Sequence, residues 1–556
     1  MLHQSISFSV TLLEQSFELP DGRVLAQTAQ VAYLDGHNKV FQTVDFGVVD
    51  KQELYQRIRE GQSLSLHHCY VAEFSLAEYR ELEGLANVDE IELPDFSAVQ
   101  CFFDNHSILD LSYAHLSGAS GKFTGSVFRS EVSFLKTRFT CSEVDFSQAR
   151  FHGNANFRYA ELTGGDVRFA AAILEGDSVS FVNSNLNNGR TDFSNARFHT
   201  TEANFQYARF REGDLTFDRS VFECRRVVMS KCEFGTGKKD FRLVSFGDAD
   251  IDFSESEFKS GKVRFRRSTF GSGRLLFEAT DFGDSEVSFE RSEFGNGKLS
   301  FHRATGGLLK LNDCHFSGLV DLRVTQFNGI DLSNATNRDL MDLKTDQGEV
   351  AIRELNLSGL RNLGRISIDW TDNNVAALIH GQANSTDKQK ADQFRLLKEE
   401  FHQAGQYNDE DAAYVQFKRL EWKHETAHLL GKKGAFRPYI YLQQFFKKLV
   451  FDWIGHYATN PIRVLGSMVI AFVAFSVLFL AVEFTGMGSI DSSLGDPDGL
   501  HRIEEAFYHS AITFLTIGYG DYYPSGLARP LSGLEGFVGL FLLSYFTVAF
   551  VRKILR

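Results

Sequence analysis

The chain has 556 residues and a formal net charge of -14, with 54 phenylalanines but only 7 prolines. This length exceeds what one ordinary domain requires. An excess of acidic residues of this size is typical of a soluble protein surface. We therefore expect no nucleic-acid partner. The excess of phenylalanine indicates an internal repeat.

Residues 1–95 show no regular period. The segments QSISFSVTLL, GRVLAQTAQVAYL and VFQTVDF are typical of short strands, and DKQELYQRIREG and SLAEYRELEGL are typical of helices. The sequence therefore predicts a small α+β module. Because the open end of a repeat array needs a cap, we expect this module to cover the first coil of the region that follows.

A twelve-residue period follows this module. From Phe157 to Phe301 a large apolar residue recurs every twelve positions, and a second series runs five residues behind it. Glycine adds a period of twenty-four at Gly165, Gly189, Gly213, Gly237 and Gly261. Neither a helix nor a simple strand produces this 5-plus-7 spacing. A solenoid does, because one large residue per face points inward and stacks on its counterpart in the next coil.

Units such as TDFSNARF and IDFSESEF resemble the pentapeptide-repeat family, whose units form the four faces of a right-handed parallel β-helix. The resemblance implies such a β-helix over residues 101–370, in about ten to eleven coils. Two twelve-residue units are expected to make one turn, with glycine at one corner per coil. Some members of this family bind other proteins, so an unknown protein partner on the β-helix is also implied. The alternative is a phenylalanine platform that stacks a ligand or nucleic acid, but inward stacking explains the strict period without it.

Helical periodicity replaces the twelve-residue period over residues 385–430. Two successive apolar faces are formed by Phe394, Leu397 and Phe401, and by Ala413, Phe417, Leu420 and Trp422. The pattern predicts a helical hairpin linker. We expect it to close the last coil of the solenoid and to connect it to the segment beyond.

Residues 438–556 form the predicted pore domain. It begins with PYIYLQQFFKKLVFDWIGHY, whose aromatic residues and lysines are typical of a membrane interface, with a buried soluble helix as the alternative. Residues 462–483 and 533–551 are apolar runs long enough to span a bilayer. Glu535 lies near the outer end of the second run. Between the runs, residues 504–515 are too short to cross, so we predict a re-entrant pore helix in an all-α, two-span domain.

Basic residues indicate the orientation, because they collect at cytoplasmic ends. The basic residues that flank the two spans are Lys447, Lys448, Arg463, Arg552, Lys553 and Arg556. Both termini are therefore expected in the cytoplasm, in a protein of the plasma (inner) membrane. The loop between the spans is acidic, as suits an outer vestibule that concentrates cations. Its acidic residues are Glu483, Asp491, Asp496, Asp498, Glu504 and Glu505.

Residues 513–521 read TFLTIGYGD. Gly518 and Gly520 allow backbone angles that point successive carbonyl groups to one side, and such irregular backbone survives at membrane depth only around a protected pore. The segment resembles the potassium-channel pore family, whose T-x-x-T-x-G-Y-G-D pattern matches at every fixed position. The alternatives are a buried turn around G-Y-G and a poorly selective cation channel. Tyr519 and Gly520 argue against the second alternative.

The resemblance also implies the roles of single residues. The ion-binding filter comprises Thr516, Ile517, Gly518, Tyr519 and Gly520, with potassium held by the carbonyl groups of the first four and by the Thr516 hydroxyl. Asp521 marks the outer mouth. Four identical subunits are implied, because a ring of carbonyl groups around one ion needs several copies.

Gating is expected towards the inner end of the second span. Glycine costs about 1 kcal/mol relative to alanine in a helix, and in the potassium-channel family a mid-helix glycine often acts as a hinge, so Gly539 is the candidate. The alternative for Gly533, Gly536 and Gly539 is close approach of neighbouring helices. Phe546 and Phe550 are candidates for a hydrophobic constriction, or else face lipid.

No enzyme is expected. The six cysteines lack C-x-x-C spacing and are expected to be reduced thiols, and GTGKKD at residues 235–240 lacks the spacing of a phosphate loop. No cofactor is expected other than the permeant potassium ion. The sequence favours a potassium-selective channel that is gated by the β-helix. The alternative is a membrane-anchored scaffold in which the solenoid binds a partner protein.

Overall fold

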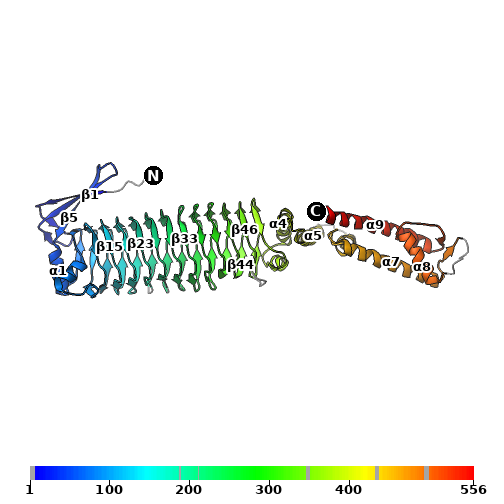
Figure 1. Ribbon diagram of the computed structural model, residues 1–556, viewed down its shortest axis with the longest axis horizontal. Coiled ribbons are helices and arrows are strands. Elements are labelled where there is room, and N and C mark those ends of the chain that lie inside the picture. The colour runs from blue at the N-terminus through cyan, green and yellow to red at the C-terminus, as the bar shows by residue number, and fades with distance from the viewer. Residues whose placement is uncertain are drawn as a thin grey trace. The chain divides into compact units, whose positions relative to one another are not determined.

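The computed structural model divides the chain into two compact units, Met1–Ala383 and Asn384–Arg556. The structure describes residues 7–186, 189–210, 212–345, 351–431, 437–493 and 500–555. The first unit is a parallel β-solenoid with an N-terminal region of strands and helices, and the second is helical (Figure 1). The multidomain fold expected from the sequence is therefore present.

The strands of the solenoid stack in parallel, one per coil on each face. The longest sheet has 13 strands, from β6 (Ser65–His67) to β47 (Leu355–Asn356). A second has 12 strands, from β11 (Ile108–Asp110) to β49 (Arg365–Ser367). The expected ten to eleven coils are thus too few. The first coils escape the count because β6 and β9 (Ser97–Val99) pair in register without the twelve-residue phenylalanine period.

Phenylalanine rings form continuous columns inside the solenoid. Phe157 stacks on Phe181, 24 residues later, with ring centroids 4.7 Å apart, and Phe181 stacks on Phe205 at 5.0 Å. Phe169, from the neighbouring column, meets Phe181 edge-on at 88°. Such aromatic contacts contribute about 0.5–1.5 kcal/mol beyond burial. These rings are completely buried, so the columns are a core and not a platform for stacking ligands.

Two kinds of corner bring neighbouring coils together. Two residues after the inward phenylalanine, a residue other than glycine takes a left-handed conformation, as at Tyr159 (φ 57°) and Asn195 (φ 56°). The glycine column has a different cause. A Cβ atom on Gly213 would lie 1.7 Å from the carbonyl oxygen of Gly189 in the preceding coil. The predicted glycine corner is therefore a place where two backbones nearly touch.

The N-terminal region extends one sheet of the solenoid. β1 (Ser7–Leu13), β4 (Thr28–Leu34) and β5 (Val40–Val49) pair antiparallel. β5 then pairs in parallel with β7 (Cys69–Ala72), a strand of the solenoid sheet. The remaining elements of this region are the hairpin β2 (Phe17–Glu18) and β3 (Val24–Leu25) and the helices α1 (Lys51–Arg59) and α2 (Leu76–Glu83).

A short helix, α3 (Val375–His380), lies against the last coils of the solenoid. Just before it, the side chain of Asn373 donates to the carbonyl oxygen of Leu343 at 2.8 Å. Just after it, the side-chain amide of Gln382 donates to the carbonyl oxygen of Leu355. The sequence analysis did not predict α3, because six residues carry too little periodicity. Closure of the last coil by the helical hairpin stays a prediction.

The second unit begins with the predicted hairpin, formed by α4 (Asp387–Gln403) and α5 (Tyr407–Leu430). Thr386 and Gln389 form a capping box at the start of α4. Gly405, with φ 72°, turns the chain after α4. The residues of α4 predicted to face the core are buried: Phe394, Leu397 and Phe401.

The rest of this unit comprises α6 (Arg437–Lys447), the π-helix η1 (Lys448–Trp453), α7 (Pro461–Phe484), β50 (Ile490–Ser492), α8 (Arg502–Phe514), β51 (Tyr522–Pro524) and α9 (Ala528–Ile554). α7 and α9 are 24 and 27 residues long, and 22% of the most apolar stretch of each is buried. Their apolar surface therefore faces outward, as in membrane spans and unlike the core helices of soluble proteins. α8 is the predicted short helix between them. The aromatic residues of α6 and η1 that are exposed are Tyr439, Tyr441, Phe445, Phe446, Phe451 and Trp453.

Candidate functional site

The short helix α8 is held against both long helices. Phe514, at its C-terminal end, packs in a cluster with Met468 of α7 and Leu542 of α9. Nearer its N-terminal end, Ala506 packs with Phe479 of α7. The loop that follows α8 therefore starts from a fixed position.

Residues 516–520 follow α8 as irregular backbone. The angle φ is positive at every second residue, with 56° at Thr516, 62° at Gly518 and 78° at Gly520. The amide groups of Ile517 and Gly518 both donate to the carbonyl oxygen of Ile512, at 2.8 and 3.3 Å. Within the described part of the chain, no group donates a hydrogen bond to the carbonyl oxygens of residues 516–520. Five consecutive carbonyl oxygens are therefore free to coordinate a ligand.

The same residues are exposed on the single subunit. Ile517 is 47% exposed and Tyr519 is 71% exposed. Large side chains of this kind, next to unused carbonyl groups, form a surface suited to contact with other copies of the chain.

The end of this loop is fixed by Asp521. The Tyr508 hydroxyl of α8 donates to Asp521 Oδ2 at 2.7 Å, and the amide of Ser493 donates to the Asp521 carbonyl oxygen at 2.8 Å. Arg502, at the start of α8, and Glu483, near the end of α7, form an ion pair of 3.4 Å. Two of the predicted vestibule acids lie outside the described residues: Asp496 and Asp498.

The sequence did not predict a polar contact between α8 and α9. Glu535 of α9 is completely buried and accepts a hydrogen bond from the hydroxyl of Ser510 in α8. One turn earlier on α9, Ser532 Oγ lies 2.9 Å from His509 Nε2. A signal was present in the sequence, because a lone carboxylate inside an apolar span is costly and usually marks a functional position.

The three glycines of α9 differ in their surroundings. A Cβ atom on Gly539 would lie 2.1 Å from the carbonyl oxygen of Phe514, one on Gly536 would lie 3.9 Å from Thr513, and one on Gly533 would meet nothing within 4 Å. Gly539 thus lets α9 approach the end of α8. α9 continues as one helix through this position, and a hinge at Gly539 stays a prediction.

Phe546 and Phe550 stack on each other, with ring centroids 5.7 Å apart. Phe546 packs against the cluster of Met468, Phe514 and Leu542, whereas Phe550 is 48% exposed. Phe550 is therefore the more available of the two for a constriction. That role stays a prediction for both.

The C-terminal end of α9 is bonded to the hairpin helix α5. Asp411 of α5 pairs with Arg552 at 3.0 Å and with Lys553 at 2.9 Å. The Arg552 guanidinium also lies over the Tyr414 ring, 4.7 Å from its centroid, a cation–π contact of about 0.5–1 kcal/mol. These four residues are called the Asp411 clasp. They connect the linker directly to the second long helix.

A strained turn precedes α7. Residues 456–458 all have positive φ, of 47°, 56° and 61°, although none is glycine, and each such residue costs about 1–3 kcal/mol. The amide of Ala458 donates to the hydroxyl of Tyr545 in α9 at 3.0 Å. Arg419 of α5 pairs with Asp452 of η1 at 2.8 Å. Contacts to α5 and α9 therefore hold this turn and η1 in place.

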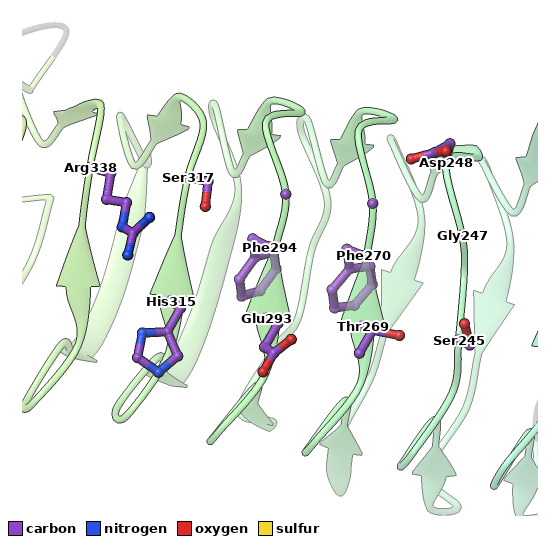
Figure 2. A pocket seen from close by; sticks show the side chains of 12 residues that line it. Ser245, Gly247, Asp248, Thr269, Phe270, Glu293, Phe294, His315, Ser317 and Arg338 are labelled. Carbon is purple, nitrogen blue, oxygen red and sulfur yellow. The ribbon is translucent and has the colours of Figure 1, made fainter.

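The solenoid carries an open groove of about 420 Å³ along one face. Figure 2 shows the ionisable side chains that line it, Asp248, Glu293, His315 and Arg338, on different coils of the solenoid. Because these groups lie on different coils along the solenoid, the groove resembles a surface for an extended partner more than a pocket around one small molecule.

The six cysteines are free thiols, and all except Cys224 are buried. Burial raises the pKa of the Cys141 thiol to about 11. A buried neutral thiol behaves as a small apolar side chain, so the five buried cysteines contribute to packing.

Two outward-facing long helices, a short helix between them and a loop of free carbonyl groups define the class: an ion-channel subunit that carries a parallel β-solenoid. Comparison with known families agrees. Residues 464–556 match the family model described as ion channel, and residues 111–161 match the model for pentapeptide repeats (9 copies). Both families are non-enzymatic, and the channel match with α7 and α9 indicates a two-span membrane protein. No curated protein and no solved structure significantly matches the chain.

Proposed function

We propose that the protein is a potassium-selective channel that conducts K⁺ passively across the membrane through the centre of a homotetramer. The row of free carbonyl oxygens at residues 516–520 carries this proposal. Rings of backbone carbonyl groups replace the hydration shell of K⁺ in such channels. The positive φ angles of Gly518 and Gly520 support it, because alternating backbone conformations turn successive carbonyl groups to one side.

Each subunit supplies one strand of the filter, so one copy is an incomplete site. Potassium would be coordinated by the carbonyl groups of Thr516, Ile517, Gly518 and Tyr519, with Gly520 completing the filter and Asp521 at the outer mouth. The exposure of Ile517 and Tyr519 supports assembly, because neighbouring subunits would cover these side chains.

The basic residues that flank α7 and α9 support an orientation with both termini in the cytoplasm, in the plasma (inner) membrane. In this orientation the Asp411 clasp lies at the inner mouth of the pore. α5 follows the solenoid in the chain and is bonded to the end of α9. Gating by the solenoid would therefore act through α5, since a movement of this helix reaches α9 through the clasp.

Flux through liposomes that contain the purified protein tests the proposal. We expect K⁺ flux that greatly exceeds Na⁺ flux, and loss of this selective flux in Gly518→Ala, because Gly518 has φ 62°. Gly466→Ala in α7 is the matched control, since a Cβ atom there meets nothing within 4 Å. Wild-type protein that passes no K⁺, or passes Na⁺ equally well, would refute the proposal.

The groove on the solenoid favours a second candidate function, a membrane-anchored scaffold that binds a partner protein along Glu293, His315 and Arg338. The Gly518→Ala variant separates the two functions in cells. A scaffold keeps its cellular role when conduction is lost, whereas a channel does not.

A further inference from the structure

One face of α9 fits the last two turns of α8. The residues of this face are Ser532, Glu535, Gly536 and Gly539, whose i, i+3, i+4, i+7 spacing places them on one side of the helix. Their counterparts on α8 are, in the same order, His509, Ser510, Thr513 and Phe514. Polar contacts thus occupy one end of this interface, and glycine contacts occupy the other.

Glu535 is the acidic residue of this interface, and it is completely buried. Removing a carboxylate from water costs several kcal/mol unless it is paired. Its Oε1 accepts the hydrogen bond from Ser510, which is also completely buried, and its Oε2 has no partner among the described residues. A leucine of similar size would avoid this cost, so general packing does not explain the carboxylate.

Ser510 is connected to the filter by a short and rigid path. Two residues further along α8, the carbonyl oxygen of Ile512 accepts the amide hydrogens of Ile517 at 2.8 Å and of Gly518 at 3.3 Å. Only helical backbone separates Ser510 from Ile512. A displacement of Ser510 therefore moves the oxygen to which the filter amides are bonded.

We propose that Glu535 is a positioning residue for the filter: by holding Ser510 it fixes the depth of α8, and with it the spacing of the carbonyl rings that separate K⁺ from Na⁺. The inference rests on the proposed potassium channel. Binding groups must be held within about 0.5 Å of their productive geometry. Without the carboxylate, the Ser510 hydroxyl turns to its other acceptor, the Phe472 carbonyl oxygen of α7, 3.3 Å away. α8 then shifts from α9 towards α7.

The permeability ratio of K⁺ to Na⁺ in the full-length channel tests this role. Ser510→Ala and Glu535→Leu should each lower the ratio roughly tenfold, because each change removes the hydrogen bond that holds α8 against α9. The double variant should lower it no further, because both changes remove the same contact. Glu535→Gln should keep the wild-type permeability ratio, since the amide oxygen of glutamine accepts the same hydrogen bond.

Ser544→Ala is the matched control. The Ser544 hydroxyl donates within its own helix, to the Leu540 carbonyl oxygen at 2.8 Å, so this change should leave the ratio unaltered. If the Glu535→Leu protein does not assemble, the Ser510→Ala variant alone tests the positioning role. It removes a single oxygen atom, so we expect this variant to assemble.

A wild-type permeability ratio in Ser510→Ala would refute the positioning role of Glu535 but leave the proposed channel function intact. Additive effects of the two substitutions in the double variant would refute the positioning role in the same way. Wild-type protein that shows no K⁺ selectivity would refute the channel itself, and the positioning role with it. The two failures are therefore distinguishable.

Discussion

The carboxylate of Asp411 in the linker helix α5 lies 3.0 Å from the guanidinium of Arg552 at the end of α9. The two residues are 141 positions apart in the chain. The Asp411 side chain is only 9% exposed and that of Arg552 is 24% exposed, so removing the carboxylate leaves the half-buried guanidinium without its charged partner. This ion pair joins the linker helix to the second long helix.

We expect Asp411→Asn to raise the open probability of the channel about fivefold. Loss of the carboxylate weakens the hold of α5 on Arg552 and Lys553 by about 1 kcal/mol, which frees the end of α9. Single-channel recording in planar bilayers measures this. Glu421→Gln is the control, because Glu421 pairs with Lys418 inside α5 at 2.7 Å. An unchanged open probability in Asp411→Asn would show that the Asp411 clasp has no role in gating.

Gly539→Ala should destabilise the assembled channel and lower K⁺ flux by roughly tenfold or more. The new Cβ atom would lie 2.1 Å from the carbonyl oxygen of Phe514, so α8 or α9 must move. Gly533→Ala should be neutral or stabilising, because its Cβ atom has open space and alanine favours helix by about 1 kcal/mol. Thermal stability in detergent and liposome flux measure both. Normal stability with altered gating in Gly539→Ala would favour the hinge.

Phe205→Ala should destabilise the solenoid by about 3–5 kcal/mol, the usual cost of a cavity in place of a buried phenylalanine. Phe205 is completely buried and stacks on Phe181 at 5.0 Å. Tyr159→Ala is the control, since Tyr159 is 44% exposed, and should cost less than about 1 kcal/mol. Urea unfolding of the full chain, followed by circular dichroism, compares the two. Equal losses of stability in the two variants would contradict the role of the buried phenylalanine column as the core of the solenoid.

Lys239 is a buried amine in the solenoid, only 1% exposed, and its Nζ donates to the carbonyl oxygens of Ser260, at 2.7 Å, and Gly235. Burial lowers the pKa of the Lys239 ammonium to about 8, whereas a lysine in an unfolded chain titrates near about 10.4. Between these values the unfolded state binds more protons. The free energy of unfolding should therefore rise with pH across this window, and Lys239 should add no pH dependence below it.

Lys239→Met should remove this rise and stabilise the solenoid at pH 7, because the cost of burying a charge disappears. Lys238→Met is the matched control, since the neighbouring lysine is exposed and should leave the rise intact. Melting temperatures of the three proteins between pH 7 and pH 10.5 measure the difference. Identical pH profiles for wild type and Lys239→Met would show that Lys239 is solvated.

The fold could be predicted wherever burial imposes a period. Phenylalanine repeats in the solenoid because each ring must stack on the one in the next coil, and helix α4 buries Phe394 and Phe401 as its periodicity indicated. The first coils were missed because their buried residues do not keep the twelve-residue period. Leu66 and Ala98 pair there in adjacent buried positions, and neither breaks the pattern of an ordinary strand.

The segment of the candidate site could be predicted from the sequence, but the contacts that hold this segment and α9 in place could not. The proposed filter is a continuous motif, so residues 513–521 could be singled out in the sequence, and their role as a filter stays a prediction. Glu535 was visible as an acid in an apolar run, although its partner Ser510 was not. Asp411 lies on a polar helix and looks like any surface acid. Its importance depends on Arg552, and no local pattern encodes proximity between residues so distant in the chain.

Each coil of the solenoid pairs only with the coil before it and the coil after it. Insertion or deletion of one whole 24-residue repeat would therefore leave both capped ends, and the register of every remaining strand, unchanged. The separation of those ends would change by one strand spacing, about 4.8 Å, for each repeat. The length of the solenoid can thus change in small equal steps, while the elements at its two ends stay the same.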